Sequence, residues 1–196
     1  METPIIYTPN WLREEAADAA FIRLWDELAW VRHDKVPRRE YYVHALDQPY
    51  SYGKAEYART YVSQPMHPEL LKIWMKAEAQ FGHAFETCFL NGYEDGKDFL
   101  GWHSDDSPEM DDFRSILIVT LGAEREIWFR PRPELLRDGW GGEHTVPVEK
   151  LTLGHGSLCE MKPGMQDTHQ HRIPKAGFEN CGPRISMTFR GYVKAA

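Results

Sequence analysis

Two histidines and one aspartate in this sequence have the residue types and the order of a metal site. His103 and Asp105 are two residues apart, and a further imidazole follows at His169 or His171. Two imidazoles and one carboxylate can hold one face of an iron(II) ion and leave the other face open for oxygen and a bidentate co-substrate. Residues i and i+2 of a strand face the same side, so His103 and Asp105 can point together into a barrel. We favour His171, directly before Arg172-Ile173-Pro174, as the third ligand.

Other interpretations of the His-x-Asp pair have to be weighed beside this one. Taken alone, such a pair is more often formed by ordinary surface residues than by metal ligands. A zinc hydrolase also binds its metal with two histidines and a carboxylate. That enzyme class would leave a second pattern, near the end of the chain, without an explanation.

The second pattern is a strand-like segment with an arginine at each end. Strand alternation places four polar residues on one face: Arg184, Ser186, Thr188 and Arg190. It places three apolar residues on the core face: Ile185, Met187 and Phe189. The arginine Cα atoms would lie about 20 Å apart at roughly 3.3 Å per residue, and side chains reaching inward would leave room for a five-carbon diacid. Arginine suits this task because its planar fork binds a carboxylate through two hydrogen bonds.

Four motifs occur together in the second half of the chain: Asn91-Gly92-Tyr93, His103-Ser104-Asp105, His171-Arg172-Ile173-Pro174-Lys175, and Arg184–Arg190 with its Thr-Phe-Arg ending. In order and spacing this set resembles the AlkB family of iron(II)- and 2-oxoglutarate-dependent nucleic-acid dealkylases. The resemblance is strong over residues 85–193 and looser over 36–80. In the looser part, Pro37-Arg38-Arg39 and Tyr57-Ala58-Arg59-Thr60-Tyr61 look like the family's substrate-binding lid.

The resemblance implies the cofactors and the residues that bind them. Iron(II) would be bound by His103, Asp105 and His171. The pocket for 2-oxoglutarate would comprise Asn91, Tyr93, Arg184, Ser186 and Arg190. Arg184 would pair with the distal carboxylate, and Arg190 would hold the end that chelates the metal. Many relatives have asparagine where this chain has Ser186, so one hydrogen bond to the co-substrate is expected to differ.

The resemblance also implies the reaction and the substrate. With O₂, 2-oxoglutarate would be converted to succinate and CO₂, and an N-alkyl carbon on a base would be hydroxylated and lost as an aldehyde. A base in a duplex would have to be flipped out. The expected substrate residues are Arg39, Tyr57, Arg59, Tyr61 and Asp106. Tyr52 is a rival for base stacking, and each of these tyrosines is as plausible in the core. Ser107 stands where relatives often carry an acidic residue, which leaves the base, and DNA or RNA, open.

Charge is distributed unevenly along the chain, whose formal net charge is -7. Residues 94–112 contain eight acidic residues and one lysine, which sums to -7. Residues 32–59 contain six basic and four acidic residues, which sums to +2, and five tyrosines are interleaved with them. Such a segment has the composition for gripping phosphates and stacking on bases, and we expect it to face the phosphates. A solvated loop with packed tyrosines is an equally weighted interpretation.

The order of the predicted elements indicates a mainly β fold with N-terminal helices and a double-stranded β-helix, or jelly-roll, core. Apolar spacing predicts helices over 12–31, with Asn10 as N-cap, and over 68–81. In the second helix the residues expected to face inward are Leu71, Trp74, Met75 and Ala79. Strands 115–121 and 126–130 are predicted to form a hairpin, and 162–183 mostly loop. We expect one domain over 1–196, with a helical cover and lid at about 1–84 and the jelly-roll catalytic core at about 85–196.

Length and composition set the remaining expectations. No stretch approaches the ~20 apolar residues of a membrane span, and the start of the chain has no signal-peptide pattern. Three cysteines without metal-type spacing fit a reducing compartment. We therefore expect a soluble monomer in the cytoplasm or nucleus, with alkylated DNA or RNA and no membrane as its partner. A non-catalytic nucleic-acid-binding jelly roll, and a related oxygenase acting on protein or a small molecule, are the alternatives.

Overall fold

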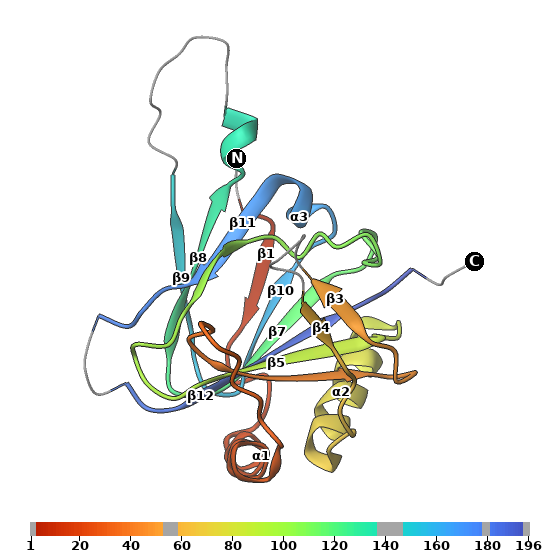
Figure 1. Cartoon of the computed structure of the whole chain (residues 1–196). Helices are drawn as coiled ribbons and strands as arrows, with labels where there is room; N and C mark the ends of the chain where they lie inside the picture. The colour runs from red at the N-terminus through yellow and green to blue at the C-terminus, as the bar shows by residue number, and fades with distance from the viewer. Residues whose placement is uncertain (1–2, 53–58, 137–146, 178–180, 194–196) are drawn as a thin grey trace.

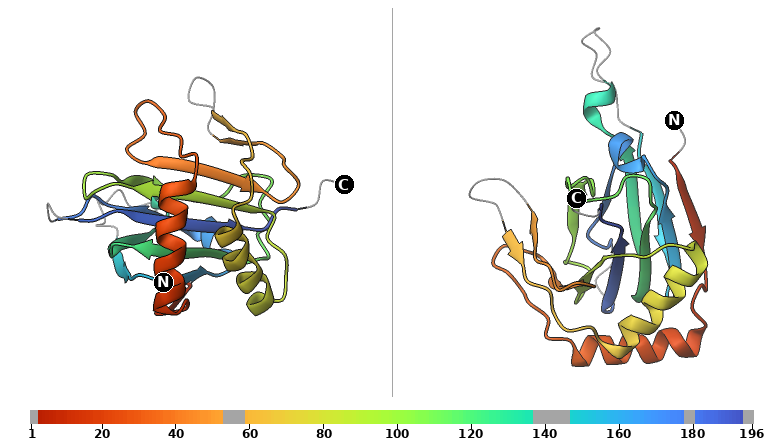
Figure 2. Two further views of the ribbon diagram at one scale, coloured as in Figure 1. Left: turned by 90° about the horizontal axis from the view of Figure 1, so that it is seen from below. Right: turned by 90° about the vertical axis from the view of Figure 1, so that its right-hand side faces the viewer.

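Two antiparallel sheets face each other, and two helices pack on the outer side of the larger sheet (Figures 1 and 2). The computed structural model describes residues 3–52, 59–136, 147–177 and 181–193. The larger sheet has the order β1 (Ile5–Thr8), β10 (Ser157–Met161), β7 (Ile116–Gly122), β12 (Arg184–Arg190), β5 (Thr87–Tyr93) and β2 (Arg39–His44). The smaller sheet has the order β6 (Leu100–His103), β11 (His169–Ile173), β8 (Arg125–Pro131) and β9 (Glu149–Leu153). This is the mainly β, jelly-roll arrangement that the sequence predicts.

The remaining elements cover the larger sheet or border the opening between the sheets. The helices are α1 (Glu14–Glu27), α2 (Pro68–Phe81) and the single turn α3 (Met165–Thr168); a 3-10 turn spans Pro133–Leu136. Strands β3 (Tyr50–Tyr52) and β4 (Arg59–Tyr61) form a separate two-stranded sheet. Within the described ranges, no helix is long and apolar enough to cross a membrane.

Helix α1 is shorter than the predicted segment, and its predicted cap is wrong. Asn10 has a φ of 52°, in the left-handed region that asparagine tolerates, and the helix begins only after Arg13. Leu12 and Leu28 are both buried in the same apolar cluster as the helix without belonging to it. Because these two leucines continue the apolar spacing of the helix, the sequence predicts a helix that is too long at both ends.

Helix α2 has the predicted bounds, and Gly82 ends it in the left-handed conformation with a φ of 71°. The predicted inward face is wrong except for Trp74, because Leu71, Met75 and Ala79 are not buried. The residues that pack inward are Leu70, Ile73, Trp74 and Ala77, together with Glu69. Two neighbouring stripes of this helix have nearly equal apolar content, so the packing partner decides which stripe is buried.

The predicted hairpin between β7 and β8 is also wrong. Strand β7 pairs with β10 and β12, whereas β8 pairs with β11 and β9, so the connection passes from one sheet to the other. Gly122 permits this turn: its φ is 85°, and a Cβ there would collide with the carbonyl oxygen of Pro183. The amide of Ala123 donates to the same oxygen at 2.9 Å, which directs the chain away from its own strand.

The sequence predicts mostly loop over residues 162–183, but this segment contains α3 and β11. Strand β11 has the sequence His-Gln-His-Arg-Ile, which lacks the apolar alternation of a typical strand. It is a strand because it pairs with β6 on one side and β8 on the other. The larger sheet also draws on the part of the chain before residue 84, since β1 pairs with β10 and β2 pairs with β5.

Candidate active site

Strand β12 is buried on both faces. Ile185, Met187 and Phe189 belong to the apolar cluster that includes the helices. The opposite face, which points between the two sheets, carries Arg184, Ser186, Thr188 and Arg190, and all four are buried. The alternation predicted from the sequence is confirmed here, and it places two guanidinium groups in the interior of the fold.

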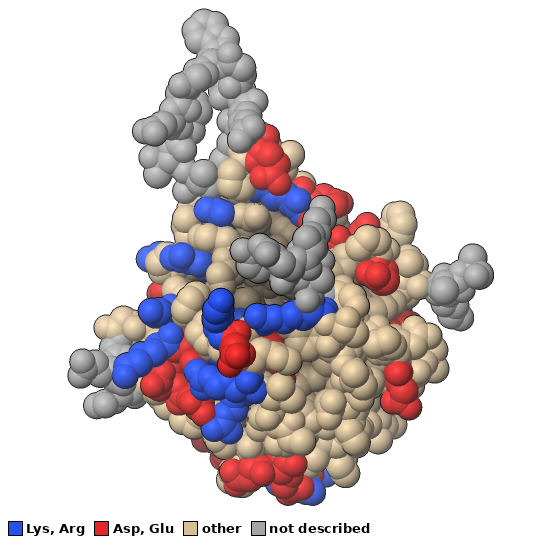
Figure 3. Space-filling model, in the orientation of Figure 1, with Lys and Arg blue, Asp and Glu red and all other residues tan. Residues whose placement is uncertain are grey.

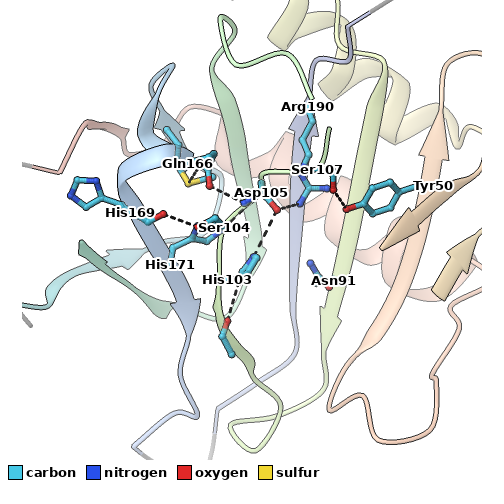
Figure 4. Close-up of polar contacts among 12 residues, drawn as sticks. Tyr50, Asn91, His103, Ser104, Asp105, Ser107, Gln166, His169, His171 and Arg190 are labelled. Carbon is cyan, nitrogen blue, oxygen red and sulfur yellow. Dashed lines mark hydrogen bonds and ion pairs between the residues drawn. The ribbon is translucent and has the colours of Figure 1, made fainter. Parts of the chain in front are cut away.

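Strands β6 and β11 bring the candidate metal ligands together (Figure 4). His171 lies opposite His103 in the register of the two strands, and their ring centroids are 4.2 Å apart. Asp105 follows two residues after the end of β6. One donor atom from each of these three residues lies within 4.8 Å of the others. Such a spacing permits all three to coordinate one ion.

Hydrogen bonds hold Asp105 in place from both sides (Figure 4). Its amide donates to Oε1 of Gln166 at 2.9 Å, and its Oδ1 accepts from Nη2 of Arg190 at 2.7 Å. Among the described residues, no donor reaches its buried Oδ2. Nε2 of His103 lies 3.9 Å from Oδ1, and Nε2 of His171 lies 3.9 Å from Oδ2. The carboxylate is thus oriented by one cation and directed toward the two imidazoles.

The protonation states of this group suit a divalent metal. Burial lowers the pKa of His103, and burial together with the neighbouring His103 lowers the pKa of His171 to about 3. Nδ1 of His103 bonds to the carbonyl of Gly101 at 2.9 Å, which can only accept, so Nε2 offers its lone pair. Burial alone would raise the pKa of Asp105, but Arg190 and the two histidines lower it to about 2. Neutral imidazoles and an ionised carboxylate are the forms that bind metal.

His169 lies on the same strand but outside this group. Its Nδ1 is 2.9 Å from Oγ1 of Thr168, and its backbone carbonyl accepts from Ser104. Figure 4 shows its ring directed away from His103 and His171. Of the two histidines considered from the sequence, the structure therefore brings His171, and not His169, to the aspartate.

Arg184 lies at the other end of β12 and is fully buried. Its Nη2 donates to Oγ1 of Thr120 at 3.0 Å, and its Cζ lies 5.2 Å from the ring centroid of Tyr93. Within the described part of the chain, no carboxylate pairs with it, and its Nε and Nη1 have no hydrogen-bond partner. Burial lowers its pKa to about 10, so it stays charged at neutral pH. An uncompensated buried cation is costly, and a carboxylate is the group that these donors fit.

The other expected co-substrate residues line up on β5 and β12. In the register of these strands, Tyr93 lies opposite Arg184, and Asn91 lies opposite Ser186. All four are buried. Oδ1 of Asn91 accepts from Nε of Arg38 at 2.6 Å. The structure therefore brings Asn91, Tyr93, Arg184 and Ser186 to one patch of the sheet, while Arg190 is at the opposite end beside Asp105.

A pocket opens onto the histidine–aspartate group, and Figure 3 shows it as the hollow near the centre of that view. Its lining residues are Arg38, Glu40, Tyr50, Tyr61, Phe89, Asn91, Leu100, Gly101, Trp102, His103, Asp105 and Arg190. Four of these are aromatic. Arg38 belongs to the lid segment Pro37-Arg38-Arg39 expected from the sequence, whereas Glu40 was not expected in the pocket. The i, i+2 spacing of Glu40 from Arg38 was the available signal.

The expected substrate residues are distributed unevenly around this pocket. Tyr61 lines it, and its ring stacks on Tyr50 with centroids 6.1 Å apart and packs edge-on against Phe89 at 4.9 Å. Its hydroxyl donates to Glu40 at 3.2 Å. Among the described residues that line the pocket, Arg39, Arg59 and Asp106 are absent. Asp106 is exposed and pairs with Arg132. Tyr57 and the side chain of Tyr52 lie outside the described residues.

Three arginines of the basic segment predicted to face phosphates are paired with carboxylates. Arg32 pairs with Glu94 at 2.7 Å and with Asp98 at 2.8 Å. Arg39 also pairs with Glu94, and Arg38 pairs with Glu40 at 2.6 Å. Glu94 and Asp98 of the acidic stretch after β5 therefore offset part of the positive charge of this segment, and the local sum of +2 does not describe a free positive surface.

Comparison with known proteins places the chain among oxygenases. The family model described as the 2OG-Fe(II) oxygenase superfamily matches residues 4–190. The solved structure of OsALKBH1 is similar, with a TM-score of 0.66, 14% identity and 98% coverage of both chains. The non-heme alpha ketoglutarate dependent epimerase SnoN has a TM-score of 0.59 at 15% identity, over 96% of this chain and 78% of that one. At these identities the structural matches show the fold alone.

Curated relatives share more sequence. Alpha-ketoglutarate-dependent dioxygenase alkB homolog 3 of Bos taurus is 32% identical over 93% of this chain and 64% of its own length. The Homo sapiens protein of that name is 30% identical with the same coverage. DNA oxidative demethylase ALKBH2 of Mus musculus is 32% identical over 67% of this chain and 53% of its own length. The chain thus spans just under two thirds of the first of these relatives.

Proposed function

This chain belongs to the 2OG-Fe(II) oxygenase superfamily. Because it is also similar to AlkB homologues over most of its length, we propose that it is an AlkB-type dioxygenase that oxidatively removes alkyl groups from N-alkylated bases of DNA or RNA. One observation carries the proposal: His103, Asp105 and His171 place their donor atoms within 4.8 Å of one another, and the first two of them line a pocket. The buried, unpaired Arg184 supports it, since it supplies a counter-charge for a dicarboxylate.

The proposed roles follow from the contacts of each residue. His103, Asp105 and His171 hold iron(II), and Arg184 with Tyr93, Asn91 and Ser186 binds 2-oxoglutarate. When bound, these two groups and O₂ supply the oxidising chemistry, which the protein itself does not contain. Arg190 positions Asp105 through its 2.7 Å hydrogen bond and keeps that carboxylate ionised. Its charge also suits the carboxylate end of the co-substrate nearest the metal.

The aromatic wall of the pocket suits a flat, uncharged or weakly charged base. Tyr61 contacts both Tyr50 and Phe89, and all three line the pocket. Tyr61 is our candidate for stacking on the target base, because aromatic stacking accepts any base. Ser107 bonds to the hydroxyl of Tyr50 at 2.8 Å, so the position that is often acidic in relatives here fixes a wall residue. The roles expected of Arg39, Arg59, Asp106 and Tyr57 stay predictions.

The proposal is tested by measuring succinate and released aldehyde with a panel of N-methylated single- and double-stranded oligonucleotides, DNA and RNA. Unmodified oligonucleotides and a methylated peptide serve as controls. Aldehyde release that depends on iron, 2-oxoglutarate and a methylated oligonucleotide supports the assignment. Oxidation of a peptide or metabolite, with no reaction on any oligonucleotide, would show that only the oxygenase class is right.

We further propose a monomeric protein of the cytoplasm or nucleus, with residues 1–84 acting as cover and lid for the core at 85–196. Light scattering tests the first point, because a monomer has the mass of one 22.8 kDa chain. A tagged copy in its native cells tests the second. Limited proteolysis tests the third, since a lid protected by substrate should be cleaved more slowly when an oligonucleotide binds.

A further inference from the structure

The outer face of the smaller sheet carries a row of tryptophans and cations. Strand alternation directs His103, Phe129 and His171 inward, and their neighbours on the same strands face outward. The residues concerned are Trp102 on β6, Arg172 on β11, Trp128 and Arg130 on β8, and Lys150 on β9. We refer to these five residues as the outer basic cluster.

The cations of this cluster lie against the indole rings. The Cζ atom of Arg172 is 4.2 Å from the ring centroid of Trp128 and 4.9 Å from that of Trp102. The Cζ of Arg130 is 4.3 Å from Trp102, and Nζ of Lys150 is 4.3 Å from Trp128. The contacts run without a break across all four strands. Each cation is thereby held in place, which reduces the conformational entropy that a ligand would have to remove.

The cluster has little negative charge bonded to it. Over the described residues, Arg130, Arg172 and Lys150 form no ion pair, and Arg130 donates both of its hydrogen bonds to the neutral Gln170, at 3.0 and 2.7 Å. The one carboxylate bonded to the described part of the cluster is Glu126, which accepts from Nε1 of Trp128 at 2.7 Å. Glu134 also acts on Arg130 electrostatically without bonding to it, so the cluster has three cations near two carboxylates. A surplus of positive charge remains, on a chain whose net charge is -7. Cation–π contacts offset the repulsion only in part, so an anion is the expected ligand.

Trp102 connects the cluster to the active-site pocket. It lines that pocket with His103, and it also lies under Arg130 and Arg172. Figure 3 shows Lys and Arg side chains gathered beside the hollow, on the side where Figure 1 places β8, β9 and β11. A polymer with one residue in the pocket would therefore have its neighbouring residues close to the cluster.

We propose that the outer basic cluster binds the sugar-phosphate backbone of the nucleic-acid strand next to the target base. This inference rests on the proposed function, and it assigns phosphate binding to the sheet rather than to residues 32–59. The indoles are covered by cations and serve to hold them, while the guanidinium and ammonium N–H groups remain the donors for phosphate. This surface does not discriminate between base sequences, because contacts to phosphate only position the nucleic-acid strand.

The experiment measures the affinity of a short, unmodified single-stranded oligonucleotide over a range of salt concentrations. Lys150→Gln and Arg130→Gln are compared with Lys76→Gln. Lys76 is a matched control, since its Nζ lies 4.9 Å from the ring of Trp11 on the helical side of the molecule. Each phosphate interaction that a substitution removes should reduce the slope of log K against log salt by about 0.7, which is roughly fivefold in affinity at 0.1 M salt. Lys76→Gln should match the wild type.

A second measurement requires no substitution and so does not depend on how a variant folds. Lysines of the wild-type protein are acetylated with and without the oligonucleotide, and Lys150 should be protected while Lys76 is not. If the wild type binds the oligonucleotide but the salt-dependence slopes are unchanged and Lys150 is not protected, the outer basic cluster does not bind phosphate. The proposed function would remain intact. If the wild type binds no oligonucleotide, the proposed function and the proposed role of the outer basic cluster are both wrong. Lys150-dependent binding of polyglutamate alone would reassign the surface to an acidic protein.

Discussion

The two faces of the four-stranded sheet carry opposite kinds of chemistry on adjacent residues. On the inner face, His103 and His171 are kept neutral by burial beside one carboxylate. On the outer face, Trp102 and Arg172, their direct neighbours in sequence, belong to a row of charged groups on indole rings. Adjacent residues of one strand therefore have different requirements. His171 must stay neutral to offer a lone pair to a metal, whereas Arg172 carries a permanent positive charge on the opposite face.

The comparison also explains why a local charge sum misleads. In residues 32–59, Arg32, Arg38 and Arg39 are paired with carboxylates, whereas the cations of the outer basic cluster are paired with aromatic rings. Both regions contain basic and aromatic residues. The two regions differ in their neighbours. Acidic residues after β5 lie beside residues 32–59, whereas the cations of the outer basic cluster lie beside the rings of Trp102 and Trp128. Free positive charge therefore depends on spatial neighbours.

The largest expected effect concerns the inner face. His171→Ala should lower turnover by more than about 100-fold, because loss of even an outer-shell partner of a metal ligand costs about 10–100-fold. His169→Ala, two residues away on the same strand, should keep most of the activity. Succinate formation and iron titration measure both variants. Loss in His169→Ala with full activity in His171→Ala would show that the third ligand is misassigned.

The next effect concerns the buried guanidinium of β12. Arg184→Ala should raise the KM for 2-oxoglutarate by roughly 30-fold or more, since removing one partner of a buried charge pair costs about 2–5 kcal/mol. Ser186→Ala is the control on the same face, and a neutral hydrogen bond is worth only about 1 kcal/mol. Steady-state kinetics of folded variants distinguish them. Small and equal changes in KM in the two variants would show that Arg184 does not bind a carboxylate of the co-substrate.

A moderate effect is expected at the pocket wall. Tyr61→Ala should weaken dealkylation by the loss of about 1–3 kcal/mol of stacking energy per base, and it should affect dealkylation more than turnover of 2-oxoglutarate without substrate. Tyr61→Phe keeps the ring and removes only the hydrogen bonds of the hydroxyl, to Glu40 and to Arg59. It should therefore resemble the wild type. A Phe variant as impaired as the Ala variant would assign the role to the hydroxyl instead of the ring.

The smallest effect sharpens the contrast between the two basic regions. Arg39→Gln should leave the salt dependence of oligonucleotide binding nearly unchanged, because the charge of Arg39 is already offset by Glu94. A partly exposed ion pair contributes about 0–1 kcal/mol, so thermal stability should change little. A drop in slope as large as that of Lys150→Gln would return phosphate binding to residues 32–59.

Several features could be predicted from the sequence because they depend on the backbone itself. Alternation along a strand is a local property, so the two faces of Arg184–Arg190 are where the sequence predicts them. The bounds of α2 follow from Pro68 at its start and Gly82 at its end. The motif order indicated the family, and the family match supports the predicted iron(II), 2-oxoglutarate and O₂.

Other features were decided only by the tertiary structure. The crossing of β7 to β8, the buried stripe of α2 and the strand character of β11 each depend on which distant segment packs alongside. The choice between His169 and His171 depends on the register of β11 against β6. The outer basic cluster joins residues from 102 to 172. A local pattern fixes which way a side chain points, but the partner that it meets is set by long-range packing of the whole chain.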